Sequence, residues 1–228
     1  MKKQAVVIFG PPGSGKGTQA ELLARRYLFI NIDSGRYIES ALRDPDAKKS
    51  PELQKEKKLF DAGILSSPSW VLKFMHGIIS GIADSGHNIV LSGSLRTVYE
   101  AFGDKQKEGL VPLLVRKYGK KNVIVIRLNV ADKSSLQRNT GRLICSVCGL
   151  QALEAAKAKQ CSLCSGPLRK RTLDKPEVIK VRLKEYRERS YPVIKEMKKH
   201  GFKVCEINGE PLPYKVFESV KKALKLTG

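Results

Sequence analysis

The sequence predicts an α/β fold in which a five-stranded parallel sheet is flanked by helices. Short apolar runs alternate with longer amphipathic segments along most of the 228 residues, and this alternation is typical of βαβ units. Two segments, 34–69 and 142–171, interrupt the alternation, so we expect each of them to be an insertion on one α/β core. Residues 1–33, 70–141 and 172–228 would form that core.

The first expected unit begins with a strand over 4–9, in which every residue after Gln4 is apolar. A continuous apolar run of this length indicates a strand that is buried on both faces of a parallel sheet. A helix is expected over 17–27, where apolar residues recur at helical spacing, and a short strand over 29–32. The third strand, over 88–91, follows the first insertion.

The first insertion and its flank should be helical. The pattern predicts helices over 35–43, 51–62 and 68–83. Proline is favourable at the first position of a helix, which suits Pro68, and serine is a favourable N-cap, which suits Ser67.

The second half of the chain continues the alternation. The fourth strand is expected over 123–128, and Asp132 can cap the helix after it. A long helix is expected over 176–200, the fifth strand over 203–207, and a closing helix over 213–226.

Composition excludes several classes of protein. Hydrophobic residues make up 41% of the chain, which argues against intrinsic disorder. No stretch approaches the roughly 18 uncharged apolar residues of a membrane span, and the apolar run near the start is too short for a signal peptide. We therefore expect a soluble, cytoplasmic protein that does not act at a membrane.

The net charge points to acidic partners. The 43 Lys and Arg residues outnumber the 22 Asp and Glu residues, which gives a formal charge of +21. A surplus of this size favours nucleotides, nucleic acid or anionic lipid as partners. Solubility is the alternative explanation for the lysines.

A glycine-rich segment joins the first strand to the first helix, which is the context that a phosphate-binding loop requires. Its backbone N–H groups and the helix N-terminus would face phosphate oxygens. Lys16 would supply a cation for the outer phosphates, and the Thr18 hydroxyl would contact a phosphate or Mg²⁺. A turn without function is the alternative. The strand, spacing, lysine and hydroxyl together favour a P-loop NTPase fold. The expected loop residues are Gly13, Ser14, Gly15, Lys16, Gly17 and Thr18.

The form Gly-x-Pro-Gly-x-Gly-Lys-Gly-Thr resembles adenylate kinases and close nucleoside-monophosphate kinases, and the resemblance extends over nearly the whole chain. The first and last motifs are specific, and the middle ones are weaker. The further motifs are Asp33-Ser34-Gly35, Asp61-Ala62-Gly63-Ile64-Leu65, Gly93-x-x-Arg96-Thr97, Arg138-x3-Arg142, and Arg171 with Arg182-Leu183-x-Glu185-Tyr186. The resemblance implies a helical insertion at 34–69 that binds the nucleoside monophosphate, and a lid at 142–171.

The resemblance also implies roles for single residues. Arg138 and Arg142 would close over the ATP phosphates from the lid side. The implied catalytic residues are Lys16, Arg96, Arg142, Arg171 and Arg182. The implied acceptor pocket is lined by Ser34, Gly35, Ile64, Leu65, Ser66, Gly93, Ser94, Leu95, Arg96, Glu100, Arg171 and Arg182. Arginine suits this chemistry because phosphoryl transfer needs charge neutralisation, and its planar fork pairs with phosphate. For each arginine, an ordinary surface or ion-paired role is the alternative.

Four positions depart from the family pattern. Ser92 stands where the family has the Asp that orders the water shell of Mg²⁺, and Glu39 stands where it has an arginine for the acceptor phosphate. Ser94 and Leu95 replace a Phe-Pro pair, and Glu100 replaces a glutamine that reads the acceptor base. Glu100 can accept a hydrogen bond from an amino group, which both adenine and cytosine present.

A carboxylate at position 39 would repel the acceptor phosphate. Arg36 and Arg43 lie one turn away on either side, and compensation by one of them is one alternative. An i,i+4 ion pair between Arg43 and Glu39 is the other.

Four cysteines have metal-ligand spacing. Cys145-x2-Cys148 and Cys161-x2-Cys164 are separated by twelve residues and can supply four thiolates to a tetrahedral Zn²⁺. The metal would stabilise a segment that is too small for its own core. A redox dithiol pair and a nucleic-acid-binding zinc ribbon are the alternatives. Residues 150–160 look helical, and Cys205 is expected to be buried in a strand.

The sequence thus predicts a monomeric, Mg²⁺-dependent nucleoside-monophosphate kinase that transfers the γ-phosphoryl group of ATP to AMP and gives two ADP. Its expected partners are nucleoside mono- and triphosphates; nucleic acid binding is possible but not required. The alternatives are a kinase with another acceptor base, and a weakly catalytic ATP-binding paralogue whose basic surface binds nucleic acid.

Overall fold

The computed structural model describes residues 3–152 and 157–226. Its centre is a five-stranded sheet with the order β2-β3-β1-β4-β8, and all of its strand pairs are parallel. The strands are β1 (Ala5–Phe9), β2 (Ile30–Asp33), β3 (Ile89–Ser92), β4 (Val123–Asn129) and β8 (Val204–Asn208). The predicted fold class is confirmed, and the ends of each predicted strand differ from the observed ones by at most one residue.

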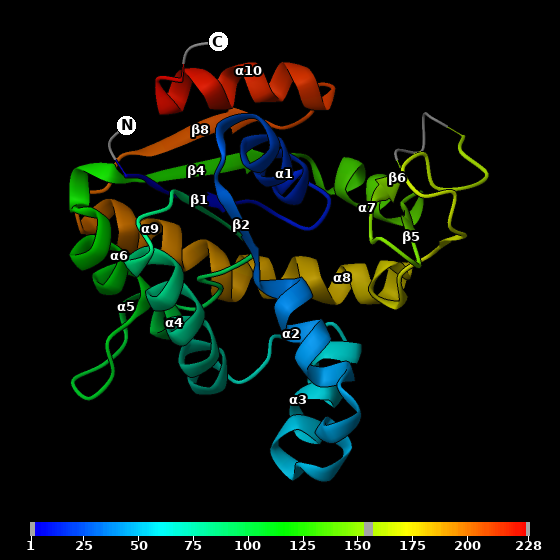
Figure 1. The fold of residues 1–228 in the computed structure, drawn as a ribbon, viewed down its shortest axis with the longest axis horizontal. Helices are drawn as coiled ribbons and strands as arrows, with labels where there is room; N and C mark the ends of the chain where they lie inside the picture. Colours follow the sequence, from blue (N-terminus) through cyan, green and yellow to red (C-terminus); the bar gives the residue numbers. More distant parts are fainter. Residues whose placement is uncertain (1–2, 153–156, 227–228) are drawn as a thin grey trace.

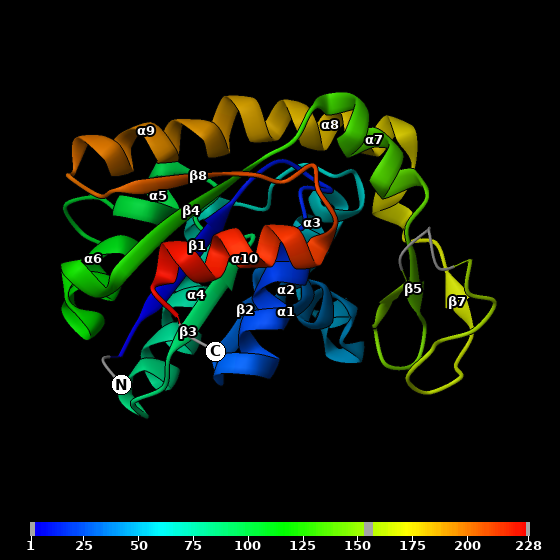
Figure 2. The ribbon, with the colours of Figure 1, turned by 90° about the horizontal axis from the view of Figure 1, so that it is seen from above.

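Helices cover both faces of the sheet (Figures 1 and 2). The helices of the α/β core are α1 (Lys16–Tyr27), α4 (Pro68–Asp84), α5 (Val98–Phe102), α6 (Leu110–Tyr118), α7 (Asp132–Thr140), α8 (Pro176–Glu185), α9 (Tyr191–Lys199) and α10 (Pro213–Leu224). Helices α1 and α10 pack on one face, and α4, α5, α6 and α9 pack on the other.

The central strand β1 explains why both faces are covered. All five of its residues are buried. Val6 and Ile8 belong to the core cluster under α1 and α10, whereas Val7 and Phe9 belong to the cluster on the opposite face. Successive side chains of a strand point to opposite faces, so a continuous apolar run needs an apolar layer on each side. Each such side chain contributes roughly 1.5–3 kcal/mol through its burial.

A helical insertion projects from the carboxyl end of β2 (Figure 1). It consists of α2 (Ser34–Arg43), the 3-10 helix η1 (Pro45–Lys49) and α3 (Pro51–Asp61). The Asp33 side chain caps α2 by accepting from the Gly35 and Arg36 amides, and the Ser50 side chain caps α3 by accepting from the Leu53 amide.

A small antiparallel sheet lies at the end of the molecule near α7 and α8 (Figure 2). Its order is β6-β5-β7, with β5 (Leu143–Cys145), β6 (Gln151–Ala152) and β7 (Leu168–Arg169). The prediction of a helix over 150–160 is wrong at residues 151–152, which pair as a strand with β5. Residues 153–156 of that prediction lie outside the described part of the chain.

Further details differ from the prediction. Helices α5 and α6 were not expected. The helix expected over 176–200 is divided by the π-helical turn η5 (Tyr186–Ser190), because Pro192 has no amide hydrogen for the helical ladder.

Helix α7 begins at Asp132 itself, with Ala131 as its N-cap. Ser67 is the N-cap of α4, but its side chain makes no capping hydrogen bond. Cys205 lies in β8 and is partly exposed. No helix of the described residues is long and apolar enough to cross a membrane.

Candidate active site

The glycine-rich loop between β1 and α1 forms one wall of the site. Gly13 has φ +74°, and a Cβ atom there would lie 2.5 Å from Asn139 Nδ2 and 2.9 Å from the Ser135 carbonyl oxygen. Gly15 has φ +93°, and a Cβ atom there would meet nothing within 4 Å. The loop therefore needs glycine at one position for packing and at the other for its backbone conformation, which exposes the first turn of α1.

Helix α7 contacts this loop, and helix α10 contacts the helix α1 that follows it. Ser135 Oγ donates to the Pro12 carbonyl at 2.5 Å, and Asn139 Nδ2 donates to the Ser135 carbonyl at 2.7 Å. Gln19 Nε2 donates to the Pro213 carbonyl at 3.0 Å. The Ser135 bond fixes the loop backbone at Pro12, and the Gln19 bond ties α1 to α10.

Lys16 folds back over the loop. Its Nζ donates to the Gly10 carbonyl at 2.7 Å and to the Pro11 carbonyl at 2.8 Å. Burial, followed by the nearby guanidinium groups of Arg96, Arg182 and Arg142, lowers the pKa of Lys16 to about 7. These four cations give this wall of the site an excess of positive charge, which favours an anionic ligand.

A cavity of about 450 Å³ opens in front of the loop. Most of the expected site residues line it. These are Gly13, Ser14, Gly15, Lys16, Gly17, Thr18, Gly35, Ile64, Leu65, Gly93, Ser94, Leu95, Arg96, Arg138, Arg142, Arg171 and Arg182. Ser34, Ser66 and Glu100 are buried behind this surface and do not line it.

Asp174 organises two of the arginines, although no motif in the sequence indicated it. Arg142 forms a bidentate pair with this carboxylate, with Nε 2.9 Å from Oδ2 and Nη2 2.5 Å from Oδ1. Arg182 Nη1 lies 3.5 Å from Asp174 Oδ1 and donates to the Leu173 carbonyl at 3.1 Å. Burial, followed by the other arginines, lowers the pKa of Arg182 to about 9. One buried carboxylate thus holds two guanidinium groups against the cavity.

Arg96 approaches from the turn after β3. Its Nε donates to the Gly93 carbonyl at 2.5 Å, and its amide donates to Glu100 Oε2 at 3.0 Å. Leu95 in this turn has φ +56°, which a proline ring does not allow, so the turn differs from one that contains the family's Phe-Pro pair.

Glu100 serves this turn as a structural residue. Its Oε1 accepts from the Thr97 hydroxyl at 2.9 Å, and its amide donates to Thr97 Oγ1 at 3.1 Å, so the Thr97 side chain caps the start of α5. Burial raises the pKa of the Glu100 carboxyl. The contact between Glu100 and an acceptor base stays a prediction.

Glu39 lies between two arginines. Arg43 Nη2 is 2.8 Å from Oε1, and Arg171 Nη2 is 3.3 Å from Oε2. Arg43 therefore forms the i,i+4 pair with Glu39. Arg36 pairs instead with Asp33 at 3.5 Å and donates to the Gly149 carbonyl at 3.2 Å. Neither Arg36 nor Arg43 lines the cavity.

The loop after β8 lies beside the glycine-rich loop and also lines the cavity. Arg138 donates to the Gly209 carbonyl at 2.8 Å and to the Glu210 carbonyl at 2.7 Å. Residues 209–213 line the cavity, although nothing in their sequence indicated a site. Tertiary folding brings them beside the glycine-rich loop, where a Cβ atom on Gly209 would lie 3.2 Å from the Ser14 carbonyl oxygen.

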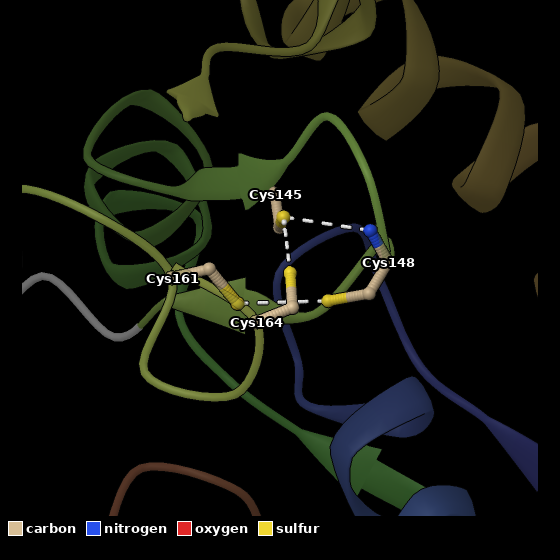
Figure 3. A group of neighbouring side chains, drawn as sticks. All are labelled: Cys145, Cys148, Cys161 and Cys164. Carbon is tan, nitrogen blue, oxygen red and sulfur yellow. Dashed lines mark hydrogen bonds between the residues drawn. The ribbon is translucent and has the colours of Figure 1, made fainter. Parts of the chain in front are cut away.

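The four cysteines meet at the base of the small sheet (Figure 3). Their sulfur atoms lie within 4.8 Å of one another, and the Cys145–Cys164 and Cys148–Cys161 sulfur pairs are each 3.5 Å apart. A tetrahedral zinc with Zn–S bonds of about 2.3 Å needs sulfurs roughly 3.8 Å apart. The donor set and its spacing therefore fit such a metal ion. Backbone N–H donation, first from Cys148, lowers the pKa of the Cys145 thiol to about 6.

Comparison with known proteins points in one direction. A profile of the family described as "Adenylate kinase" matches residues 8–202. The chain is 31% identical to an adenylate kinase of Caldicellulosiruptor bescii over 228 residues, which cover 98% of each chain. It is 31% identical to one of Methanothrix thermoacetophila, over 96% of this chain and 97% of that one. It is 30% identical to one of Chlamydia pneumoniae, over 98% of each chain.

Proposed function

Because the chain belongs to the adenylate kinase family of phosphotransferases, we propose that it transfers the γ-phosphoryl group of ATP to AMP and gives two ADP. Family membership supports a nucleoside-monophosphate kinase; the choice of AMP is the finer part of the proposal. The observation that carries it is the convergence of Lys16 with Arg96, Arg142 and Arg182 on one cavity beside a glycine-rich loop.

The loop and Lys16 would hold the ATP phosphates. The Lys16 ammonium group donates to the carbonyls of Gly10 and Pro11, which lie in the loop itself. The flexible Lys16 side chain can therefore exchange these carbonyls for phosphate oxygens without a change in the backbone. Arg138, which is fixed to the loop at 209–210, would close the same side of the cavity.

The arginines would neutralise and align the transferring group. Asp174 holds Arg142 in a bidentate pair, which fixes the orientation of its planar fork before substrate arrives. Charge neutralisation and in-line positioning account for most of the catalysis in phosphoryl transfer. Arg96 and Arg182 would therefore contact the acceptor phosphate and the migrating phosphoryl group from the other side of the cavity.

Magnesium fits the oxygen donors of this cavity, because the hydroxyls of Thr18 and Ser92 and the carboxylate of Asp33 line it, and Mg²⁺ prefers oxygen ligands. When it is bound to the nucleotide, the ion neutralises phosphate charge. Zinc would be structural: four cysteine ligands leave no open position for substrate.

We further propose a division into three parts. Residues 1–33, 70–141 and 172–228 would be the P-loop core, 34–69 the part that binds the monophosphate, and 142–171 the lid. The position of α2 and α3 on one side of the cavity, and of β5, β6 and β7 on another, supports this division (Figure 1).

A coupled assay of ADP release with ATP and each of AMP, CMP, UMP and GMP tests the proposal. We expect AMP to give the highest kcat/KM and Lys16→Ala to abolish turnover. A higher kcat/KM with another monophosphate would keep the kinase and change the acceptor. No turnover with any of the four, together with intact ATP binding, would favour a paralogue without transferase activity.

A further inference from the structure

Asp33 occupies a position at the site that the roles above do not explain. It is the last residue of β2, and in the sheet register it pairs with Ser92, the last residue of β3. Both residues line the cavity with Lys16 and Thr18. The carboxyl ends of parallel strands form the edge where ligands bind in open α/β sheets, so Asp33 lies at the edge that faces the phosphate loop.

The other carboxylates on the wall hold backbone segments. Among the described residues, the acidic side chains that line the cavity are Asp33, Glu185 and Glu210. Glu185 accepts from the Leu65 amide at 3.3 Å and pairs with Arg189 at 3.1 Å. Glu210 accepts from the Ala131 amide at 2.7 Å. These two carboxylates are engaged in fixing the shape of the cavity.

The two oxygens of Asp33 have different surroundings. Oδ1 accepts from the Gly35 amide at 3.1 Å and from the Arg36 amide at 3.4 Å, and thereby caps α2. Oδ2 lies 3.5 Å from Arg36 Nε, which is a long ion pair. Arg36 also donates from Nη2 to the Gly149 carbonyl. One oxygen thus stabilises the helix, while the other is weakly held beside a cavity rich in cations.

Magnesium on a nucleotide needs such an oxygen. Mg²⁺ usually keeps several water ligands and takes one or two carboxylates, and P-loop proteins use a loop hydroxyl together with an aspartate at a strand end. Thr18 supplies the hydroxyl here, and the strand-end residue Ser92 carries no charge; its Oγ donates to Asn31 Oδ1 at 3.4 Å.

We propose that Asp33, in the strand next to Ser92, is the carboxylate that orients the hydrated Mg²⁺ of the bound nucleotide in this chain. The inference rests on the proposed function for its ligand, MgATP. Asp33 acts on the reaction through the metal, so it is a positioning residue, and α2 capping is its second and separate task.

Asparagine at this position separates the two tasks. Asn is as good an N-cap as Asp, so Asp33→Asn keeps an acceptor for the α2 amides and removes the charge. Calorimetric titration of the full chain with ATP, in EDTA and in Mg²⁺, then measures how much the metal strengthens ATP binding. We expect Asp33→Asn to reduce that strengthening by roughly 10-fold or more, the effect typical of losing a partner around a metal, and to leave ATP binding in EDTA unweakened.

Two further variants sharpen the test. Asp33→Asn/Ser92→Asp should recover the effect of Mg²⁺, because it places a carboxylate on the adjacent strand end. Asp46→Asn removes an exposed carboxylate of the insertion that lies outside the cavity and pairs with Lys49 at 2.7 Å, and it should keep the wild-type effect. If Asp33→Asn unfolds, Asp33→Ser retains a capping hydroxyl and takes its place.

Mn²⁺ used in place of Mg²⁺ gives a second readout. The electron paramagnetic resonance spectrum of Mn²⁺ bound with ATP should differ between the wild-type protein and Asp33→Asn. An unchanged effect of Mg²⁺ on ATP binding in folded Asp33→Asn would overturn the inference. Both readouts are independent of turnover. If Asp33→Asn loses the Mg²⁺ effect and the wild-type protein phosphorylates no monophosphate, the role of Asp33 stands and the kinase is rejected. If the wild-type protein turns over normally and Asp33→Asn keeps the Mg²⁺ effect, the kinase stands and the role of Asp33 is rejected.

Discussion

Lys16 couples nucleotide binding to pH. Its pKa is lowered to about 7 in the absence of nucleotide, first by burial and then by the cavity arginines. Bound phosphates favour the protonated ammonium and raise this pKa again. Above pH 7 the complex therefore holds more protons than the free protein. ATP affinity should be constant below about pH 7, apart from the titration of ATP itself, and should fall as the pH rises above it.

Calorimetry at about pH 8.5, in buffers with different ionisation enthalpies, checks this by counting protons. The wild-type protein should take up as much as one proton per ATP bound. Lys16→Met is the matched control and should take up none. Equal uptake by the two proteins would assign the proton to another group.

We expect Glu39 to compete with an acceptor phosphate for Arg171, because its Oε2 already lies 3.3 Å from that guanidinium. Glu39→Gln should therefore lower the KM for AMP by about 1.5- to 5-fold, the scale of one partly exposed ion pair. Steady-state kinetics at saturating ATP measure it. Arg43→Gln leaves Glu39 with Arg171 as its remaining pair and should not lower KM. A rise in KM for Glu39→Gln would mean that Glu39 positions Arg171 for substrate.

At this scale the sequence revealed the residues that lie close together along the chain. The loop at 10–18 was recognisable because one strand, one turn and one helix start are enough to define it. Asp174 was not, because its importance comes from two arginines that are 32 and 8 residues away. The hydrogen bond from the Thr97 hydroxyl to the Glu100 carboxylate was also not foreseen, although the two residues lie within one turn.

At the scale of elements, the small sheet depends on its cysteines. The strands β5, β6 and β7 have two or three residues each, which is too few for an independent sheet. We expect one zinc per chain. Removal of the zinc by a chelator should increase amide hydrogen exchange in 142–152 and 157–171 and leave β1, β3 and β4 protected.

Cys148→Ser should reproduce the effect of the chelator, and Cys205→Ser, outside the cluster, should not. Mass spectrometry under native conditions gives the metal content. The prediction would be contradicted if the wild-type protein binds no zinc. It would also be contradicted if amide hydrogen exchange in 142–152 and 157–171 is the same with and without zinc.

The elements differ in how clearly the sequence encodes them. The strands of the large sheet were readable because β1, β3 and β4 are mainly apolar, and β2 and β8 combine apolar with polar residues over a few positions. Helix α6, with the sequence LVPLLVRKY, has apolar residues through most of its length, so it shows little helical periodicity. Helix α5 has only five residues. The short strands at 151–152 and 168–169 are fixed by the folding of the cysteine segment, and their own propensity is too small to reveal them.

At the scale of the whole molecule, the helical insertion and the small sheet touch each other across the cavity. Arg36 Nη2 donates to the Gly149 carbonyl at 3.2 Å, and Glu39 meets Arg171. Arg36→Ala removes the first contact and should increase hydrogen exchange of the 143–152 backbone in the nucleotide-free protein. Lys48→Ala, on the exposed side of the insertion, should have no effect. Equal exchange in wild type and Arg36→Ala would show that this contact does not hold the two parts together.

These two contacts should also slow the release of nucleotides from the cavity. We expect a nucleotide to leave after the helical insertion and the lid segment separate, which would break the Arg36–Gly149 hydrogen bond and the Glu39–Arg171 ion pair. Such bonds weaken in salt, so product escape should accelerate with ionic strength even while encounter with the negatively charged substrate slows. The turnover rate would then pass through an optimum at an intermediate salt concentration. Product release, rather than phosphoryl transfer, would set that optimum.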